Sequence, residues 1–352
     1  MTATAFTGTR SVPFFDGAPM MDGLKDGILA DISELIDSGR FINGPQVAEF
    51  EASFAAYCET ATCVGAASGL DALRLVLIAA GLEPGDEVIV PAQTFIATFE
   101  AVTQAGGVPV VVDVSETDYT MDPAAASAAV TPLTRFLMPV HIYGQMADMR
   151  ALELVSMSKE IGIIEDACQA HGADRDGIRA GAEGLAAAFS FYPAKNLGAM
   201  GDAGALVTSD LALADRVRAL REHGQTEKYR HVVEGFTARM DTLQAIVLRH
   251  KLQHLDAWNE SRRAAARFYS EALDGVGDLR VPPVPENSNP VWHLYVIRTA
   301  EPERLAEHLA ERGIATGRHY PEPPHLSVAY ERLGHAAGDF PVAEAISAFF
   351  RG

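Results

Sequence analysis

Short apolar runs typical of buried strands alternate with helical patterns through the first two-thirds of the chain. Helical spacing is clearest where Val47, Phe50 and Phe54 recur on one face. This alternation is typical of an α/β fold, in which a mostly parallel sheet is covered by helices on both faces. Counting the apolar runs predicts seven strands. One follows a turn within 81–91, and the others lie at 63–67, 108–114, 135–141, 161–166, 185–191 and 204–209.

The pattern changes in the last third, where a long helical stretch replaces the alternation. Beyond it, 291–298 alternates like a strand, and 302–312 reads as a helix with a proline in its first turn. A length of 352 residues suits one large domain and one small one. We therefore expect a large domain at 1–250 and a small C-terminal α+β domain at 251–352.

The net charge limits the partners that the chain can have. It carries 28 Lys and Arg against 47 Asp and Glu, a formal charge of −19, and such a surface repels phosphate backbones and anionic membranes. We expect neither a nucleic-acid polymer nor a membrane as partner. The three cysteines form no C-x-x-C pair, which favours a reducing compartment and a cytoplasmic protein. Buried donors can still bind a small anion, because salt screens distant surface charge.

Residues that carry chemistry gather after the predicted strands rather than in the familiar short motifs. G-x-G-x-x-G, G-x-x-x-x-G-K-[ST], H-E-x-x-H and G-x-S-x-G are all missing. Dinucleotide, P-loop, zinc-protease and α/β-hydrolase chemistry therefore lose their main support, and no metal site is expected. Ligands of open α/β sheets bind beyond the carboxyl ends of strands. Polar signals at such ends are Ser68-Gly69, Asp166, and Ser190 with Lys195.

Lys195 and Asp166 are the strongest pair among these signals. The lysine follows a predicted strand in an otherwise uncharged stretch, where apolar surroundings would lower its pKa toward that of a reactive amine. Asp166 ends the run 161–166, and the 29 residues that separate the pair are one helix-and-strand excursion, so both reach the same sheet edge. A carboxylate facing a lysine-bound cofactor keeps a pyridine nitrogen protonated. Glu165 points to the opposite face. Taken singly, the lysine would be assigned to the surface and Asp166 to a helix cap.

The turn Ser68-Gly69-Leu70 opens a predicted helix. A helix N-terminus entered through glycine presents free N–H groups and a partial positive charge to an anion. Ser190, five residues before Lys195, would add a hydroxyl donor. Alone, these features are an ordinary helix cap and a strand serine, but together they predict a phosphate site.

Eight stretches occur in a fixed order between about Phe41 and Phe340: FINGPQVAEFEASFAAY, SGLDALRLVL, GDEVIVPAQTFIAT, MPVHIYGQ, IEDACQAHGA, FSFYPAKNLGAMGDAG, EGFTARMDTLQA and GRHYPEPPHL. In this order they resemble the DegT/StrS-like nucleotide-sugar aminotransferases. The resemblance implies the type I fold of pyridoxal-phosphate (PLP)-dependent transferases, whose large domain holds a mixed, mostly parallel seven-stranded sheet. It also implies pyridoxal 5′-phosphate as the cofactor, with pyridoxamine 5′-phosphate formed in the half-reaction.

The resemblance assigns roles to residues of this chain. Lys195 is implied to bind the cofactor covalently and then to move protons, and Asp166 to face the pyridine nitrogen. The implied cofactor contacts are Gln169 at the ring hydroxyl, Phe95 on the ring face, and Ser68, Gly69, Leu70 and Ser190 at the phosphate. The implied substrate contacts are Arg239, His319, Tyr320 and His325. A second subunit completes the family's site, which implies a homodimer with Thr237 reaching the partner's cofactor.

Three features depart from the family pattern. Leu70 replaces a frequent threonine of the phosphate turn and offers only its backbone N–H. Thr237 replaces the asparagine that the partner subunit usually supplies, leaving a hydroxyl as donor. Relatives normally continue past FPVAEAIS with a further segment and helix, so the small domain is either truncated or divergent at its end.

The resemblance implies amino transfer in two halves. An amino acid, L-glutamate in our expectation, aminates the cofactor, which then aminates the ketone of a nucleotide-linked deoxysugar, with a dTDP-3-keto-6-deoxyhexose favoured. An aminocyclitol aminotransferase keeps the same lysine and differs only in its ketone, so it stays open. A related deoxysugar dehydratase has His in place of the lysine, which argues against that activity. A non-catalytic regulatory paralogue that binds PLP is the alternative of another class. It predicts loss of Lys195 or Asp166, and both are present.

Overall fold

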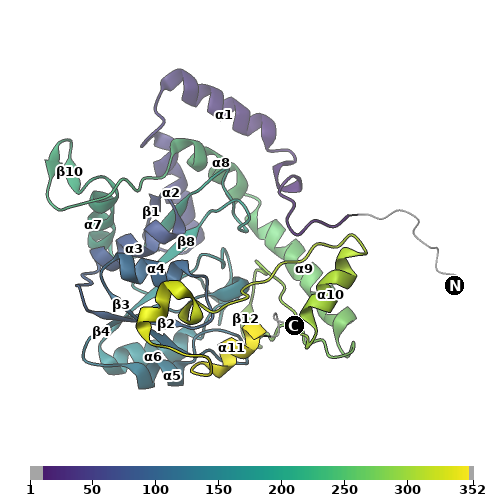
Figure 1. Ribbon diagram of the computed structural model, residues 1–352. Helices are drawn as coiled ribbons and strands as arrows, with labels where there is room; N and C mark the ends of the chain where they lie inside the picture. The colour runs from purple at the N-terminus through teal and green to yellow at the C-terminus, as the bar shows by residue number, and fades with distance from the viewer. Residues whose placement is uncertain (1–10, 349–352) are drawn as a thin grey trace.

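The computed structural model describes residues 11–348 and is built around one seven-stranded sheet (Figure 1). All seven predicted strands belong to it, in the spatial order β1-β9-β8-β5-β4-β2-β3. β9 pairs antiparallel with β1 and β8, whereas the other pairs are parallel. The predicted mixed, mostly parallel sheet is confirmed. The strands are β1 Thr62–Ala66, β2 Glu87–Pro91, β3 Val108–Val112, β4 Thr134–Leu137, β5 Gly162–Asp166, β8 Ala186–Ser190 and β9 Gly204–Thr208.

The reversed direction of β9 brings its first residue to the edge where the parallel strands end. Gly204 lies opposite Ala66 and Ser190, the last residues of β1 and β8. Asp166 ends β5 and pairs with Ala188 of β8 at the same edge. The strand ends that carry the polar signals therefore converge, as expected for a ligand site of an open α/β sheet.

Helices cover both faces of the sheet, because successive strand residues point to opposite sides. Val88 and Val90 of β2 enter one apolar cluster, whereas Ile89 enters the other. The first cluster is covered by α3 (Gly69–Ala79), α4 (Ala97–Gln104), α7 (Leu211–Arg221) and α11 (Pro341–Ala348). The second is covered by α2 (Pro45–Tyr57), α5 (Pro123–Ala129), α6 (Met149–Lys159) and α8 (Thr242–Leu252).

Two peripheral elements expose apolar side chains. Helix α1 (Lys25–Ser38) crosses the top of the view, and the hairpin of β10 (Gln225–Glu227) and β11 (Arg230–His231) projects at the upper left (Figure 1). Ile36 on α1 is 63% exposed and Tyr229 in the hairpin is 81% exposed. Clustered exposed apolar surface usually marks an interaction site.

The C-terminal third contributes one strand to a second, three-stranded sheet. After α9 (Leu255–Leu273), β12 (Ser288–Asn289) pairs with β6 (Asp174–Arg175), which also pairs with β7 (Ile178–Arg179). The predicted helix near 302–312 is confirmed as α10 (Pro302–Ala310). Short 3-10 turns complete the order: η1 Pro19–Met21, η2 Ile142–Gly144, η3 Pro324–Leu326 and η4 Val328–Leu333.

Helix α11 is fixed to the sheet by one carboxylate. Asp113 accepts the backbone N–H groups of Val342 and Ala343, each at 2.9 Å. Ile346 of this helix enters the same apolar cluster as β2.

The division of the chain near residue 250 stays a prediction, and the outer ends of the two predicted domains, 1–10 and 349–352, lie outside the described residues.

The strand predicted at 291–298 is wrong. This segment carries only an isolated bridge, between Arg298 and Arg280. Trp292 adopts a left-handed conformation with φ 49°, which interrupts an extended run. The segment instead forms backbone hydrogen bonds with a loop, since the N–H of Val291 donates to the carbonyl of Gly144 at 2.9 Å.

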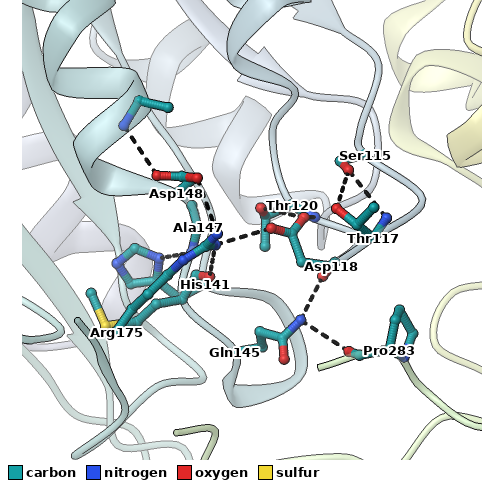
Figure 2. A network of polar contacts seen from close by, with 12 residues as sticks. Ser115, Thr117, Asp118, Thr120, His141, Gln145, Ala147, Asp148, Arg175 and Pro283 are labelled. Carbon is teal, nitrogen blue, oxygen red and sulfur yellow. Dashed lines mark hydrogen bonds and ion pairs between the residues drawn. The ribbon is translucent and has the colours of Figure 1, made fainter. Parts of the chain in front are cut away.

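A buried network of polar contacts holds the β6–β7 hairpin against the rest of the fold (Figure 2). The guanidinium of Arg175 donates to Asp118 at 3.0 Å and to Asp148 at 3.1 Å. Gln145 donates to the backbone carbonyls of Asp118 and Pro283, at 3.1 and 3.2 Å. Because Pro283 lies beyond α9, the network ties the C-terminal third to the sheet.

None of the helices within residues 11–348 is long and apolar enough to cross a membrane. In the same part of the chain, no cluster of three or more His, Cys, Asp or Glu side chains is placed to hold a metal ion. Cys58, Cys63 and Cys168 are free thiols.

Replacing Arg175 by leucine tests the buried network. The variant leaves the Asp118 carboxylate buried without its cation, so we expect the free energy of unfolding to fall by about 3–5 kcal/mol. Urea unfolding of the purified protein measures this loss. The matched control is Arg304→Leu, which removes an ion pair with Glu301 in which both side chains are exposed, and should cost about 0–1 kcal/mol. Equal losses in the two variants would contradict the role of the network.

Candidate active site

Asp166 is held at the end of β5 with its carboxylate already oriented. The residue is 5% exposed. Its Oδ2 accepts a hydrogen bond from the Thr98 hydroxyl at 2.7 Å, and its Oδ1 accepts the backbone N–H of Cys168 at 3.2 Å. Together the two hydrogen bonds fix the orientation of the carboxylate. Glu165 points to the other face, as predicted, and accepts from the N–H of Gly181 at 2.8 Å.

Lys195 lies beyond β8 in a turn closed by its own N–H, which donates to the carbonyl of Tyr192 at 2.8 Å. Burial lowers the pKa of the amine, while Cys168 and Asp166 act in the opposite direction. These electrostatic partners place the amine in the same cluster as the carboxylate. Its Nζ forms no hydrogen bond or ion pair with another of the residues 11–348. A partly desolvated amine without a partner is a candidate nucleophile.

The turn into α3 meets the ends of β8 and β9 at very short range. Ser68 caps the helix, and its Oγ accepts the N–H of Asp71 at 3.0 Å. A Cβ on Gly69 would lie 2.7 Å from the Cβ of Ser190, and one on Gly204 would lie 2.2 Å from the carbonyl carbon of Ser68. Only glycine permits these approaches. The first N–H groups of α3, those of Gly69 and Leu70, have no acceptor within the helix and suit an anion.

A second wall of the site is built by hydrogen bonds between distant segments. The amide of Gln169 donates to the hydroxyl of Tyr320 at 3.0 Å and accepts the N–H of Tyr143 at 2.7 Å. The Tyr143 hydroxyl donates to the carbonyl of His319. Burial raises the pKa of Tyr320 to about 12, so its phenol stays protonated. The Phe95 ring is 51% exposed and lies 5.6 Å from the Tyr320 ring.

Other predicted site residues have different surroundings. Arg239 pairs with Glu222 at 2.7 Å, and the hydroxyl of Thr237 lies 3.2 Å from Nε2 of His223. His325 is 1% exposed, and its Nε2 lies 3.3 Å from Glu344. Within residues 11–348, no contact joins Thr237, Arg239 or His325 to Lys195 or Asp166. Their predicted roles therefore stay predictions.

The structure adds residues that the sequence interpretation did not single out. Thr98 orients Asp166 and Tyr143 positions Gln169. Nε2 of His171 lies 2.9 Å from the carbonyl of Ser190, and burial lowers the pKa of this imidazole to about 3. Thr98 lies in TFIAT, Tyr143 in MPVHIYGQ and His171 in IEDACQAHGA. All three residues therefore lie within the stretches that carry the family resemblance, but their contacts with the site depend on the fold and cannot be read from the sequence.

The residues present fit a pyridoxal phosphate. The amine of Lys195 is unpaired, Asp166 offers an oriented carboxylate, and a glycine-bounded turn beside Ser190 presents N–H groups to a phosphate. An aldehyde, a ring nitrogen and a phosphate need these three groups.

Comparison with known proteins gives concordant matches. Residues 23–349 match the DegT/DnrJ/EryC1/StrS aminotransferase family. The erythromycin biosynthesis sensory transduction protein EryC1 of Saccharopolyspora erythraea is 47% identical, covering 96% of this chain and 92% of that protein. The dTDP-3-amino-3,4,6-trideoxy-α-D-glucose transaminase of Streptomyces venezuelae is also 47% identical, covering 96% of this chain and 89% of that protein.

The fold agrees with a solved structure. The X-ray structure of Streptomyces venezuelae DesV in complex with a ketimine intermediate superposes with a TM-score of 0.94, at 47% identity, over 96% of this chain and 91% of that one. Together, the family match over most of the chain, the sheet and the constellation around Lys195 lead to one conclusion. The chain belongs to the DegT/DnrJ/EryC1/StrS aminotransferase family and is a pyridoxal-phosphate-dependent aminotransferase of type I fold.

Proposed function

We propose that this aminotransferase moves an amino group from L-glutamate to the ketone of a nucleotide-linked deoxysugar, with a dTDP-3-keto-6-deoxyhexose as the favoured acceptor. The observation that carries the proposal is the unpaired amine of Lys195 beside Asp166 and the anion-binding turn. The relative from Streptomyces venezuelae, named as a dTDP-aminodeoxysugar transaminase, supports the acceptor class.

Lys195 would hold the cofactor and then carry the proton. When bound, pyridoxal phosphate supplies an electron sink for the charge that develops as a proton leaves the substrate carbon. Besides holding the cofactor, the amine of Lys195 would accept the proton that leaves the substrate carbon, because burial lowers its pKa. The lysine thereby serves as base in one direction and as acid in the other.

Asp166 would keep the ring nitrogen protonated. Thr98 and the N–H of Cys168 fix its two oxygens, so the carboxylate needs no reorganisation when the cofactor binds. Gln169 would contact the ring hydroxyl, and Phe95 would cover the ring face. Ser68, Gly69, Leu70 and Ser190 would hold the phosphate.

The partners of the site are part of the proposal. We propose a cytoplasmic homodimer in which Thr237 and Arg239 act at the partner's site, with His319, Tyr320 and His325 on the substrate side. The exposed apolar residues of α1 and of the β10–β11 hairpin support an interface. The domain boundary near residue 250 belongs to the same proposal.

Two alternatives differ in what they predict. An aminocyclitol aminotransferase would have the same catalytic residues. A regulatory role is suggested by the name of the relative EryC1, but a purely regulatory protein does not need the oriented Asp166 or the unpaired amine of Lys195.

Purified protein offered keto-deoxysugar nucleotides and keto-inositols should aminate only the former, as measured by mass spectrometry of the products. Amination of keto-inositols alone would replace the proposed acceptor.

Replacing Lys195 by alanine should abolish the covalent link to the cofactor. We expect wild-type protein with added pyridoxal phosphate to show a visible band that borohydride removes, and the variant to show no such fixation. The half-reaction with glutamate should slow by about 10²–10⁴-fold in the variant, because the proton carrier is lost. Absence of a band in the wild type would refute the cofactor role of this lysine.

Replacing Asp166 by asparagine should keep the cofactor but remove its electronic control. We expect the visible band to persist while half-transamination with glutamate slows by about 10²–10³-fold, since one preorganised charge is lost. Stopped-flow absorbance measures both. Thr98→Val leaves the charge and removes one orienting bond, so its effect should be smaller. Undiminished turnover in Asp166→Asn would exclude the assigned role.

A further inference from the structure

Arg262 is a half-buried cation on α9 without a carboxylate partner. Its Nη1 donates to the backbone carbonyl of Trp292 at 3.1 Å, and within residues 11–348 no Asp or Glu pairs with it. Other half-buried or buried arginines of this acidic chain do have such partners: Arg175 pairs with Asp118, Arg221 with Glu51 and Arg239 with Glu222. Leaving a desolvated guanidinium without an anion is costly, so the unpaired charge of Arg262 calls for a function.

The segment that Arg262 contacts forms part of the wall of the active site. Leu294 donates its N–H to the carbonyl of Tyr143 at 3.3 Å. A Cβ on Gly144 would lie 2.8 Å from the backbone nitrogen of His293, so the two segments pack backbone against backbone. Tyr143 in turn donates to Gln169. Arg262 and His293 are therefore two contacts away from the cofactor-facing residues.

The imidazole of His293 is also left without a partner. Its Nδ1 is inaccessible to solvent and has no hydrogen bond within residues 11–348. Burial, and then the positive charges of Lys195 and Arg262, hold the pKa of this imidazole well below its usual range, and His171 and His319 act in the same direction. The main charged groups within residues 11–348 that act on this imidazole are therefore cationic.

We propose that Arg262 and His293 form a subsite for an oxyanion of the substrate, a carboxylate or a phosphate, on the wall next to Lys195. The proposal rests on the function proposed above, because both the amino-acid donor and the nucleotide-linked acceptor carry such a group. A planar guanidinium with free donors binds either anion in bidentate fashion. The ring N–H of a neutral imidazole adds a donor without adding charge.

Arg263 provides a control for the possibility that Arg262 only holds the segment around Trp292 in place. The next residue, Arg263, lies on the same helix and clamps the same segment, since its Nε donates to the carbonyl of Pro290 at 3.1 Å. Unlike Arg262, it pairs with a carboxylate, that of Glu260 at 3.6 Å. Arg263→Gln therefore removes a comparable clamp without removing the proposed anion site.

The test compares Arg262→Gln with Arg263→Gln in each half-reaction, followed by cofactor absorbance. We expect Arg262→Gln to raise the half-saturating concentration of one substrate by 10-fold or more, with the limiting rate within about threefold of wild type. A rise with glutamate assigns the subsite to the donor carboxylate, and a rise with the sugar nucleotide assigns it to the diphosphate. Arg262→Lys keeps the positive charge but cannot bind an anion in bidentate fashion, so it should recover part of the affinity lost in Arg262→Gln.

A binding measurement separates this proposal from the proposed function. Calorimetric titration of the cofactor-loaded protein with succinate and with inorganic pyrophosphate should show at least one anion binding 10-fold more weakly to Arg262→Gln than to Arg263→Gln. This result would support the subsite even if wild-type protein transferred no amino group, which would refute the proposed function alone. Indistinguishable behaviour of the two glutamine variants in kinetics and titration would overturn the subsite.

Discussion

The close approach of β9 to the turn after β1 is the constraint on which the site depends. A side chain at Gly204 would place its Cβ 2.2 Å from the backbone of Ser68, and backbone cannot move aside as a flexible side chain can. This contact sets the N-terminus of α3 beside Ser190, because Gly204 pairs with the last residues of both β1 and β8. The reversed strand thus joins the turn at Ser68 and Gly69 to the strand that leads to Lys195.

The parallel strands beside it set the rest of the chemistry. Asp166 ends β5, and α4 covers the same face, so the Thr98 hydroxyl meets the carboxylate at 2.7 Å. The neighbouring Glu165 faces the other way, and its carboxylate accepts hydrogen bonds from the backbone N–H groups of Gly181 and Gly184. A one-residue change of register would exchange these two carboxylates. The alternation of the pleat therefore decides which of the two carboxylates lies near Lys195.

Much of this arrangement could be predicted from the sequence, because the seven buried strands are continuous apolar runs and parallel strands end at one edge. The shared edge and the 29 residues between Asp166 and Lys195 together predict that the two side chains meet. Contacts that depend on side chains from remote segments, such as Thr98 on Asp166 or Arg262 beside His293, leave no periodic signal. The false strand at 291–298 has a similar cause, since the left-handed Trp292 lies where this segment packs against the remote residues Tyr143 and Gly144.

The acidic surface and the cationic interior of the site are compatible because they act over different ranges. Most of the net charge of −19 is exposed, and salt screens it beyond about 8 Å. Lys195 and Arg262 lie in partly desolvated surroundings, where a charge at 4 Å acts with about 4 kcal/mol at an effective dielectric constant of 20. In the proposed subsite, a small anion would therefore gain more from these two groups than the distant carboxylates cost it. A long polyanion gains the same local contacts but must also lie across the acidic exterior.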